Sequence, residues 1–512
     1  MHNNIGNNRT IVKNTVVLYF RMLLLIFVGL YTSRVILQVL GVEDYGIYSS
    51  VGGVVGLMTF LNAALATGSS RFLTFELGRD DDNRLKAMFS TLLSAHIILG
   101  LIIILLSETI GLWIVYNKII IPAERFDAAV ICFHLSVLSC FIGIVQVPYR
   151  AIIISHERMN IYAYTSILDA ILKLAIVFAL YKSPIDLLVY YAILLTLETA
   201  LVAYIYKWYC TKNFSEGRYQ LFIDKAIMKE VLGYSLWNLL ANIAVTLKDQ
   251  GAVVLISMFF NPSVVAAQTV ANKVNETANQ FVDNFRTAAN PQIVKKYAAG
   301  DLKGSSSLML SSTKYSYFML LILGLPIILV AKPLLMLWLG QIPDYSVAFL
   351  QILIICSIIN VFNSSLYTAV YAKGQIKENA ISGSIIWLMV IPCSYVFFKL
   401  GFSPIAIAWV TLFYNAILSF IQKPVILHTI VHYQWMDLLN LFKDCLIVTL
   451  ISVPLPIFLY IKKNSLFPNE IIQFLILVFV SVVSVFLTVW FVGLDSITRK
   501  RVLSFVKNKM NL

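Results

Sequence analysis

Long apolar stretches separated by short polar loops recur along the whole chain, and they constrain the fold more than any other feature. Val16–Leu40, Met88–Leu112, Leu308–Val330 and Ile471–Gly493 are each long enough to cross a bilayer. A bilayer offers the backbone no hydrogen-bond partners, so such stretches must be helices packed as a bundle. Hydrophobic residues make up 59% of the 512 residues and charged residues only 13%. The sequence therefore predicts an all-α integral membrane protein.

About fourteen transmembrane helices are predicted, in two six-helix lobes around a central cavity, followed by two further helices. The lobes are 1–206 and 231–423; residues 207–230 form a cytoplasmic linker, and residues 424–512 hold the last two helices and a basic cytoplasmic tail. The lobes resemble a duplication, which predicts an axis along the membrane normal between them. The predicted spans are 14–40, 45–67, 87–112, 129–148, 162–181, 184–206, 231–258, 262–285, 308–330, 346–368, 381–400, 404–423, 442–461 and 470–493.

Lysine and arginine alternate in number from loop to loop. About 26 of them fall in the predicted inner loops and about 7 in the outer loops. Basic residues accumulate on the cytoplasmic side of membrane proteins, so both termini are predicted to be cytoplasmic. This topology accounts for the net charge of +13. No nucleic-acid partner is therefore expected.

Cysteine spacing gives no sign of a metal centre. The six cysteines lie in or beside apolar helices, without CxxC spacing or a histidine cluster, and are predicted to be packing residues. The chain also has no Walker A sequence, so no internal ATPase is expected. We predict no metal and no cofactor.

Three predicted spans carry polar residues every three or four positions, which places them on one helix face. Such stripes either line a wet cavity that suits the hydroxyl groups of sugars, or hydrogen-bond to one another between helices. We favour the cavity. The stripes are Ser235, Asn238, Asn242, Thr246 and Asp249 in the seventh span, Gln268, Asn272, Asn275, Asn279 and Asp283 in the eighth, and Ser357, Asn360, Ser364 and Thr368 in the tenth.

Cations also fall inside the predicted spans. Lys173, Lys248 and Lys273 lie near the middle of theirs, where each costs roughly 2.5–3.5 kcal/mol unless it is compensated. Asp169 lies four residues before Lys173, which predicts an ion pair within the helix. Asp249 follows Lys248 directly and points about 100° away, so that pair is less natural.

Glu276 lies three residues after Lys273, and the first span contains Arg21 and Arg34, which either snorkel to the interface or point inward. Buried cations beside polar stripes predict a cavity for an anionic, phosphate-bearing substrate. The substrate-binding candidates are Arg21, Arg34, Asn238, Asn242, Lys248, Asn272, Lys273, Asn275 and Asn279. The candidates for ion coupling are Asp169, Lys173, Asp249, Glu276 and Asp283.

Two segments resemble the polysaccharide and O-antigen flippases of the multidrug/oligosaccharidyl-lipid/polysaccharide exporter superfamily. One is residues 33–48, which contain the pattern Leu-Gly-x-x-x-Tyr-Gly, and the other is Thr67–Arg71. The resemblance implies a two-lobed transporter that works by alternating access. It also implies a substrate, a lipid-diphosphate-linked oligosaccharide moved across the bacterial cytoplasmic (inner) membrane, and a cationic cavity.

The function predicted from this resemblance is a flippase for surface polysaccharide biosynthesis, such as that of the lipopolysaccharide O-antigen. Its partners are the lipid bilayer and an anionic lipid-linked glycan, and the coupling ion, H+ or Na+, is left open. One alternative is a cation-coupled multidrug antiporter of the same superfamily. Another is a membrane polysaccharide polymerase or acyltransferase, but the largest outer segment, Trp113–Asp127, is too short for a catalytic subdomain. We therefore expect no enzymatic activity.

Overall fold

The computed structural model describes residues 2–79, 81–220, 223–496, 498–500 and 503–504; the side chains of residues 1–21, 60–61, 63–64, 66–67, 230, 232–241 and 288 lie outside the description. All secondary structure in these ranges is helical, as predicted. The chain forms two compact units, 1–269 with 398–400, and 270–397 with 401–512. By packing, the helix that follows the 207–230 linker belongs to the first unit, and the predicted lobe boundaries stay a prediction.

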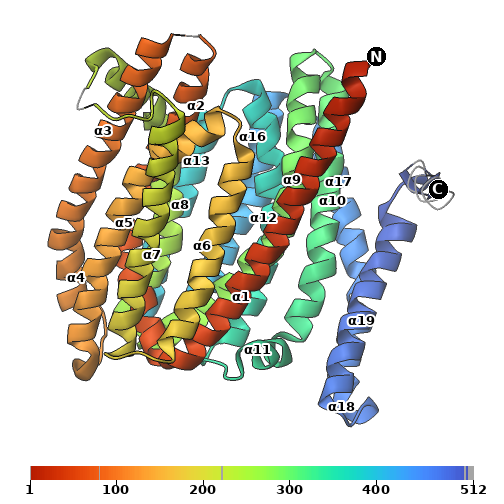
Figure 1. The fold of residues 1–512 in the computed structure, drawn as a ribbon. Coiled ribbons are helices and arrows are strands. Elements are labelled where there is room, and N and C mark those ends of the chain that lie inside the picture. Colours follow the sequence, from red (N-terminus) through yellow and green to blue (C-terminus); the bar gives the residue numbers. More distant parts are fainter. Residues whose placement is uncertain (1, 80, 221–222, 497, 501–502, 505–512) are drawn as a thin grey trace. The chain divides into compact units, whose positions relative to one another are not determined.

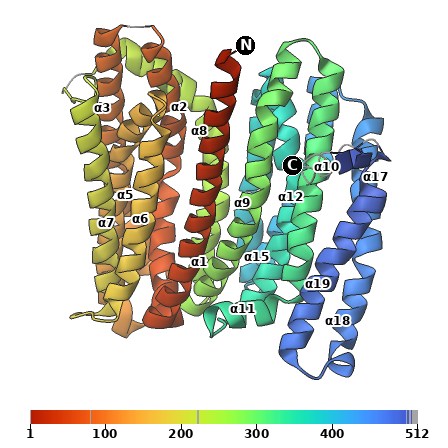
Figure 2. The ribbon, with the colours of Figure 1, turned by 45° about the vertical axis from the view of Figure 1, so that its right-hand side comes forward.

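The first unit consists of long helices that run side by side (Figures 1 and 2). Within it α5 packs against α2, α3 and α7, and α6 packs against α1 and α7. The helices are α1 (His2–Met58), α2 (Phe60–Leu77), α3 (Asp82–Leu106), α4 (Leu112–Asn117), α5 (Phe126–Ser155), α6 (Met159–Leu180), α7 (Leu187–Asn213), α8 (Lys225–Phe259) and the first turns of α9 (Pro262–Ala298).

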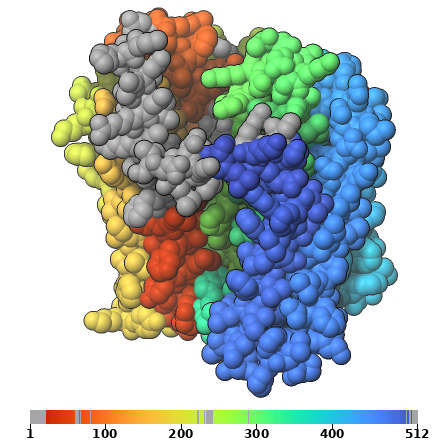
Figure 3. Space-filling view, turned by 90° about the vertical axis from the view of Figure 1, so that its right-hand side faces the viewer, coloured from red at the N-terminus to blue at the C-terminus, as the bar shows by residue number. Residues whose placement is uncertain are grey.

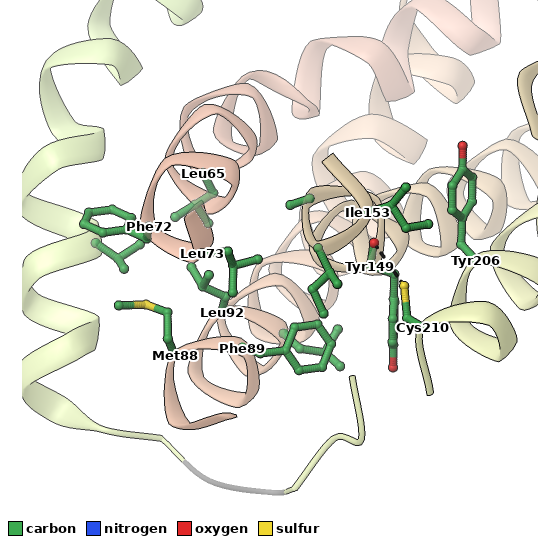
Figure 4. Packing of buried hydrophobic residues seen from close by; sticks show 14 of the residues in the cluster. Leu65, Phe72, Leu73, Met88, Phe89, Leu92, Tyr149, Ile153, Tyr206 and Cys210 are labelled. Atoms are coloured by element: carbon green, nitrogen blue, oxygen red, sulfur yellow. Dashed lines mark hydrogen bonds between the residues drawn. The ribbon is translucent and has the colours of Figure 1, made fainter. Parts of the chain in front are cut away.

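Aromatic and aliphatic side chains fill the interior of this unit, as the close view in Figure 4 shows. The ring of Phe89 on α3 meets the ring of Tyr149 on α5 edge-on, with centroids 5.3 Å apart. The thiol of Cys210 on α7 lies 3.3 Å from the carbonyl oxygen of Tyr149. Lipid tails are as apolar as these side chains, so close packing and such polar contacts, more than exclusion from water, hold the helices together.

A kink in α1 explains the Leu-Gly-x-x-x-Tyr-Gly pattern. Gly41 has φ 82°, in the left-handed region that favours glycine, so the helix turns there as predicted. Arg125 then binds Asp44 through two hydrogen bonds of 2.7 and 2.6 Å. Gly46 packs against the backbone of Pro262, leaving no room for a side chain. The pattern thus fixes the chain after the kink.

The second predicted span, 45–67, has different bounds in the structure. The helix after the kink continues to Met58, is interrupted at Thr59, and resumes as α2 up to Leu77. Residues beyond 67 remain helical because small and apolar residues continue to pack inward; Ser69 and Leu73 are buried. The polar loop therefore begins only at Gly78, the C-cap of α2.

The second unit begins within α9 and is centred on α12, which packs against α10 and α15. π-helical turns interrupt its later helices, at Leu418–Gln422 and Leu427–Val431. The helices are α10 (Leu302–Leu329), α11 (Ala331–Leu339), α12 (Ser346–Lys373), α13 (Lys377–Leu388), α14 (Val390–Lys399), α15 (Ala406–Ile417), α16 (Lys423–Ile426), α17 (Trp435–Ser452), α18 (Pro454–Leu466) and α19 (Glu470–Thr488).

The last helices, α17 to α19, leave many large apolar side chains exposed. Leu450, Phe458, Ile461, Ile471 and Phe479 are all more than half exposed. Figure 3 shows this part of the chain, in dark blue, as a broad face of the second unit. Such a face is stable only against lipid or another apolar surface. The two predicted C-terminal spans are confirmed as the helical segments Trp435–Leu466 and Glu470–Gly493.

Eleven helical segments in the described ranges are long and apolar enough to cross a membrane. The predicted multi-pass membrane protein is therefore confirmed, while the count of fourteen stays a prediction. Three predicted spans, 45–67, 231–258 and 262–285, have no separate segment among the eleven; they correspond to α2, α8 and α9. Two of these, α8 and α9, carry the polar stripes that lower their hydropathy.

The segment between α7 and α8 folds back onto the first unit instead of hanging free. The backbone N–H of Asp224 donates to Thr91 Oγ1 at 3.1 Å, and the Tyr219 hydroxyl lies 3.0 Å from Ser94 Oγ. His156 Nε2 lies 2.5 Å from a carboxylate oxygen of the buried Glu216. This predicted linker is therefore fixed at its described residues to α3 and to the end of α5.

Candidate functional site

A polar cavity of about 320 Å³ lies inside the first unit, between α1, α5, α6 and α7. Leu25 comes from α1, Gln146 and Arg150 from α5, and the remaining lining from α6 and α7. The α6 and α7 residues are Tyr162, Thr165, Ser166, Asp169, Lys173, Glu198, Thr199, Val202 and Tyr206. Within an apolar bundle this is a costly concentration of polar groups, which marks it as a functional candidate.

The predicted ion pair between Asp169 and Lys173 is confirmed in this cavity. Lys173 Nζ donates to both carboxylate oxygens of Asp169, at 2.9 and 2.8 Å. One turn of helix separates the two residues, so they share a face of α6. The cation is thereby neutralised inside its own helix.

Glu198 on α7 completes the cluster, and sequence reasoning missed it. Its carboxyl group lies within hydrogen-bonding distance of that of Asp169, and Thr199 Oγ1 donates to Glu198 Oε2 at 3.4 Å. Only 6% of Glu198 is exposed, and Oε1 receives no hydrogen bond from any described donor. The signal available in the sequence was a single acid within an otherwise apolar span.

In the second unit the polar stripes of α9 and α12 bind each other. Asn279 donates to Ser357 Oγ at 2.9 Å, and Ser357 donates in turn to Asn275 Oδ1 at 2.8 Å. Farther along, Thr368 donates to Asn290 Oδ1 at 3.0 Å. The alternative of interhelical hydrogen bonding therefore holds for these residues.

Arg286 belongs to the same interface, although its position suggested an inner loop. It lies within α9 and donates to the hydroxyl and the carbonyl oxygen of Ser364 on α12, at 2.9 and 3.1 Å. It also pairs with Asp283 at 3.1 Å. The loop assignment was wrong because α9 runs to Ala298, well beyond the predicted end at residue 285. Asp283, a coupling candidate, is thus engaged by a cation of its own helix.

The two central lysines differ in their surroundings. Lys248 pairs with Asp249, contrary to the expectation that neighbouring residues point apart, because the long, flexible lysine side chain reaches its neighbour. Lys248 is 19% exposed in its side chain. Lys273 on α9 is half-buried, and the structure gives it no ion pair within the described ranges, so the pair suggested with Glu276 does not form.

The remaining substrate-binding candidates lie on α1, α8 and α9. Arg34, Asn242 and Asn272 are half-buried, on α1, α8 and α9 respectively. The side chains of Arg21 and Asn238 lie outside the described residues. All six cysteines are free thiols, four of them buried, which confirms their predicted packing role.

Comparison with solved structures identifies the fold. The lipid II flippase MurJ, in an inward closed conformation, matches with a TM-score of 0.69 at 14% identity, over 93% of this chain and 98% of that chain. An inward-facing multidrug resistance MATE family transporter of the MOP superfamily matches with a TM-score of 0.66 at 14% identity, over 78% of this chain and 92% of that chain. A MOP superfamily transporter from Pyrococcus furiosus matches with a TM-score of 0.53 at 15% identity, over 79% of this chain and 94% of that chain. At these identities the likeness establishes the fold.

Comparison of the sequence identifies the family. A search among curated proteins found no match. The family described as polysaccharide biosynthesis protein matches residues 11–297, which is more than half of the chain and includes the kinked α1 and the whole of α8. The chain therefore belongs to the polysaccharide biosynthesis protein family, as its resemblance to the polysaccharide flippases predicted.

Proposed function

We propose that the protein is a flippase that moves a lipid-diphosphate-linked oligosaccharide across the bacterial cytoplasmic membrane, for surface polysaccharide biosynthesis. The observation that carries this proposal is the match to the polysaccharide biosynthesis family over residues 11–297. The fold shared with a lipid II flippase supports it, because that protein is also a flippase for a lipid. Both termini face the cytoplasm in this proposal, and the predicted lobes alternate access.

The substrate's diphosphate binds the cations, and its glycan binds amide side chains. Lys273 suits the diphosphate because it is half-buried without an ion pair in the described ranges. Lys248 binds the same diphosphate, which replaces Asp249 as its partner. Arg21 and Arg34 add charge, and arginine binds phosphate oxygens in pairs. Asn238, Asn242 and Asn272 contact the sugar, and the lipid tail stays in the bilayer.

Neutralising the lysines tests this proposal. In cells whose surface glycan depends on this protein, replacing Lys248 and Lys273 together by Met abolishes surface glycan and accumulates the lipid-linked precursor, while the protein level stays normal. Arginine at both positions preserves the charge and retains part of the activity. Lys303→Met is the matched control, since Lys303 is exposed at the start of α10. Unchanged surface glycan in the double variant would contradict the substrate site.

Multidrug antiport is a second candidate, favoured by one observation. A MATE family transporter gives a TM-score of 0.66, close to that of the lipid II flippase. Intramembrane lysines disfavour it, because a cationic drug is repelled by a cationic cavity. Ethidium efflux that depends on expression of the protein, and that the same lysine variants leave unchanged or raise, would replace the flippase by an antiporter.

A further inference from the structure

Asp169 and Glu198 in the first-unit cavity cannot form a hydrogen bond with each other if both are ionised, because neither then has a proton to donate. Asp169 and Glu198 approach within hydrogen-bonding distance, yet a carboxylate has only acceptor oxygens. Glu198 Oε1 is buried and receives no hydrogen bond from any described donor. Two carboxylates that share a site repel each other when both are ionised, so one of them holds a proton.

Lys173 decides which carboxyl holds it. Its ammonium group contacts both oxygens of Asp169, at 2.9 and 2.8 Å, and so stabilises Asp169 in the charged form. Among the described residues, Glu198 contacts no ammonium group and accepts its side-chain hydrogen bond from the neutral hydroxyl of Thr199. The added proton therefore belongs on Glu198, where it forms a hydrogen bond to Asp169.

The same lysine argues against a metal ion. A sodium ion needs several oxygen ligands around it, and the oxygens of Asp169 are already occupied by Lys173 Nζ. A proton needs only one acceptor and a second oxygen to share it. The cavity of about 320 Å³ also has room for several water molecules, each of about 30 Å³ in the liquid, which can deliver the proton.

We propose that Glu198, hydrogen-bonded to Asp169, binds and releases the proton that couples transport to the proton gradient. The proton passes from a hydronium ion in the cavity to a Glu198 oxygen, and water is left; release reverses this step. The proposal rests on the proposed transport function for its physiological role, and names its coupling ion.

Other ionisable groups surround the pair, and their charges set the pH at which it titrates. Lys173 and Tyr162 belong to α6, and Arg150 to α5. Tyr206 lines the cavity from α7, while Tyr191 of α7 and Tyr48 of α1 interact electrostatically with Glu198. Arg150 is exposed, so Lys173 is the cation whose removal changes the pair most.

Carbodiimide labelling tests the proton directly, without substrate. Dicyclohexylcarbodiimide enters apolar sites and reacts with the protonated carboxyl group, and mass spectrometry of peptides locates the product. We expect labelling of Glu198 in the purified full-length protein at neutral pH, falling as pH rises. Exposed Glu157, on a loop of the same unit, remains unlabelled and is the internal control. Absence of label on Glu198 at every pH from about 5 to 8, where proteins tend to be most stable, overturns the proposal.

Variants of Lys173 and Asp169 distinguish a proton-binding role of Glu198 from a purely structural role. Lys173→Met removes the compensating charge, so Glu198 holds its proton more tightly and labelling extends to higher pH. Asp169→Asn frees Lys173 to pair with Glu198, so labelling is lost. An unchanged pH profile in Lys173→Met overturns the proposal, and the wild-type profile decides the question even where a variant fails to fold.

Export assays distinguish this proposal from the transport function itself. Glu198→Gln should abolish the dependence of glycan export on the proton gradient. If labelling follows expectation but Glu198→Gln exports normally, the coupling role is refuted while the flippase function stands. If the double lysine variant exports normally but labelling behaves as expected, the substrate site fails and the proton site remains.

Discussion

Replacing Gly46 by alanine is the sharpest test of how the kinked α1 is held. A Cβ atom at Gly46 would lie 1.9 Å from the carbonyl oxygen of Pro262 and 2.5 Å from its carbonyl carbon. Ordinary contact begins at 3.4 Å, so the two backbones must separate by about 1.5 Å. The neighbour is backbone and not a flexible side chain, so it yields only by moving a helix end.

The expected cost follows from two opposing effects. Overpacking that shifts backbone costs typically 1–3 kcal/mol, and a displacement of this size belongs at the upper end, about 3 kcal/mol. Alanine in a helix interior recovers about 0.5–1 kcal/mol relative to glycine. The net loss is about 2 kcal/mol, which corresponds to a Tm lower by about 4–8 °C for a unit of this size.

Gly52 supplies the matched control on the same helix. A Cβ atom there meets nothing within 4 Å, so Gly52→Ala gains helix preference without a clash. Thermal unfolding of both detergent-purified variants, followed by tryptophan fluorescence, should lower the Tm for Gly46→Ala and leave it equal or higher for Gly52→Ala. Equal Tm values for the two variants would refute the close approach of α1 to Pro262.

Two further contacts give direct predictions. Arg125→Ala leaves the largely buried Asp44 unpaired and should cost about 1–3 kcal/mol of unfolding free energy, measured by the same melts. Hydrogen bonds from Arg125 lower the pKa of Asp186. A carboxyl group whose pKa is lowered in the folded state adds stability above its unfolded-state pKa, and this stability is lost as pH falls through the folded-state pKa. The difference in Tm between the wild type and Arg125→Ala should therefore shrink as the pH falls into the acid range. A difference that stays constant with pH would contradict this. Ser357→Ala leaves Asn279 without its acceptor on α12 and should lower the Tm by about 1–3 °C for roughly 0.6 kcal/mol. Ser306→Ala, near the start of α10, is the control.

Local features of the fold were predictable because they depend on neighbours in sequence. The turn at Gly41 and the pair between Asp169 and Lys173 both lie within one or two turns of helix. The family resemblance, too, rested on residues around this turn. Helix ends were less predictable. The apolar stretch that set the predicted end of α9 stops near residue 285, but the helix continues with more polar residues to Ala298.

The cluster around Glu198 was not predictable, since it depends on which helices are neighbours. Periodicity places Asp169 on a face of α6, but it does not say that α7 presents Glu198 to that face. The pair of Lys248 with Asp249 was missed for a different reason. Helical geometry sets adjacent Cβ atoms about 100° apart, yet a four-carbon side chain has enough reach to close that angle.

The polar and charged residues of α9 divide into two roles. At about 100° per residue, Asn275, Asn279 and Arg286 share the face that binds α12, whereas Lys273 projects well away from that face. The amides bound to Ser357 are engaged in packing and have less capacity left for a glycan. Lys273 remains available for an anion. Substitution of Asn279 should therefore lower stability first and export only as a consequence, while substitution of Lys273 should lower export in a protein that melts normally. If both variants behaved alike, this division of the α9 residues would be wrong.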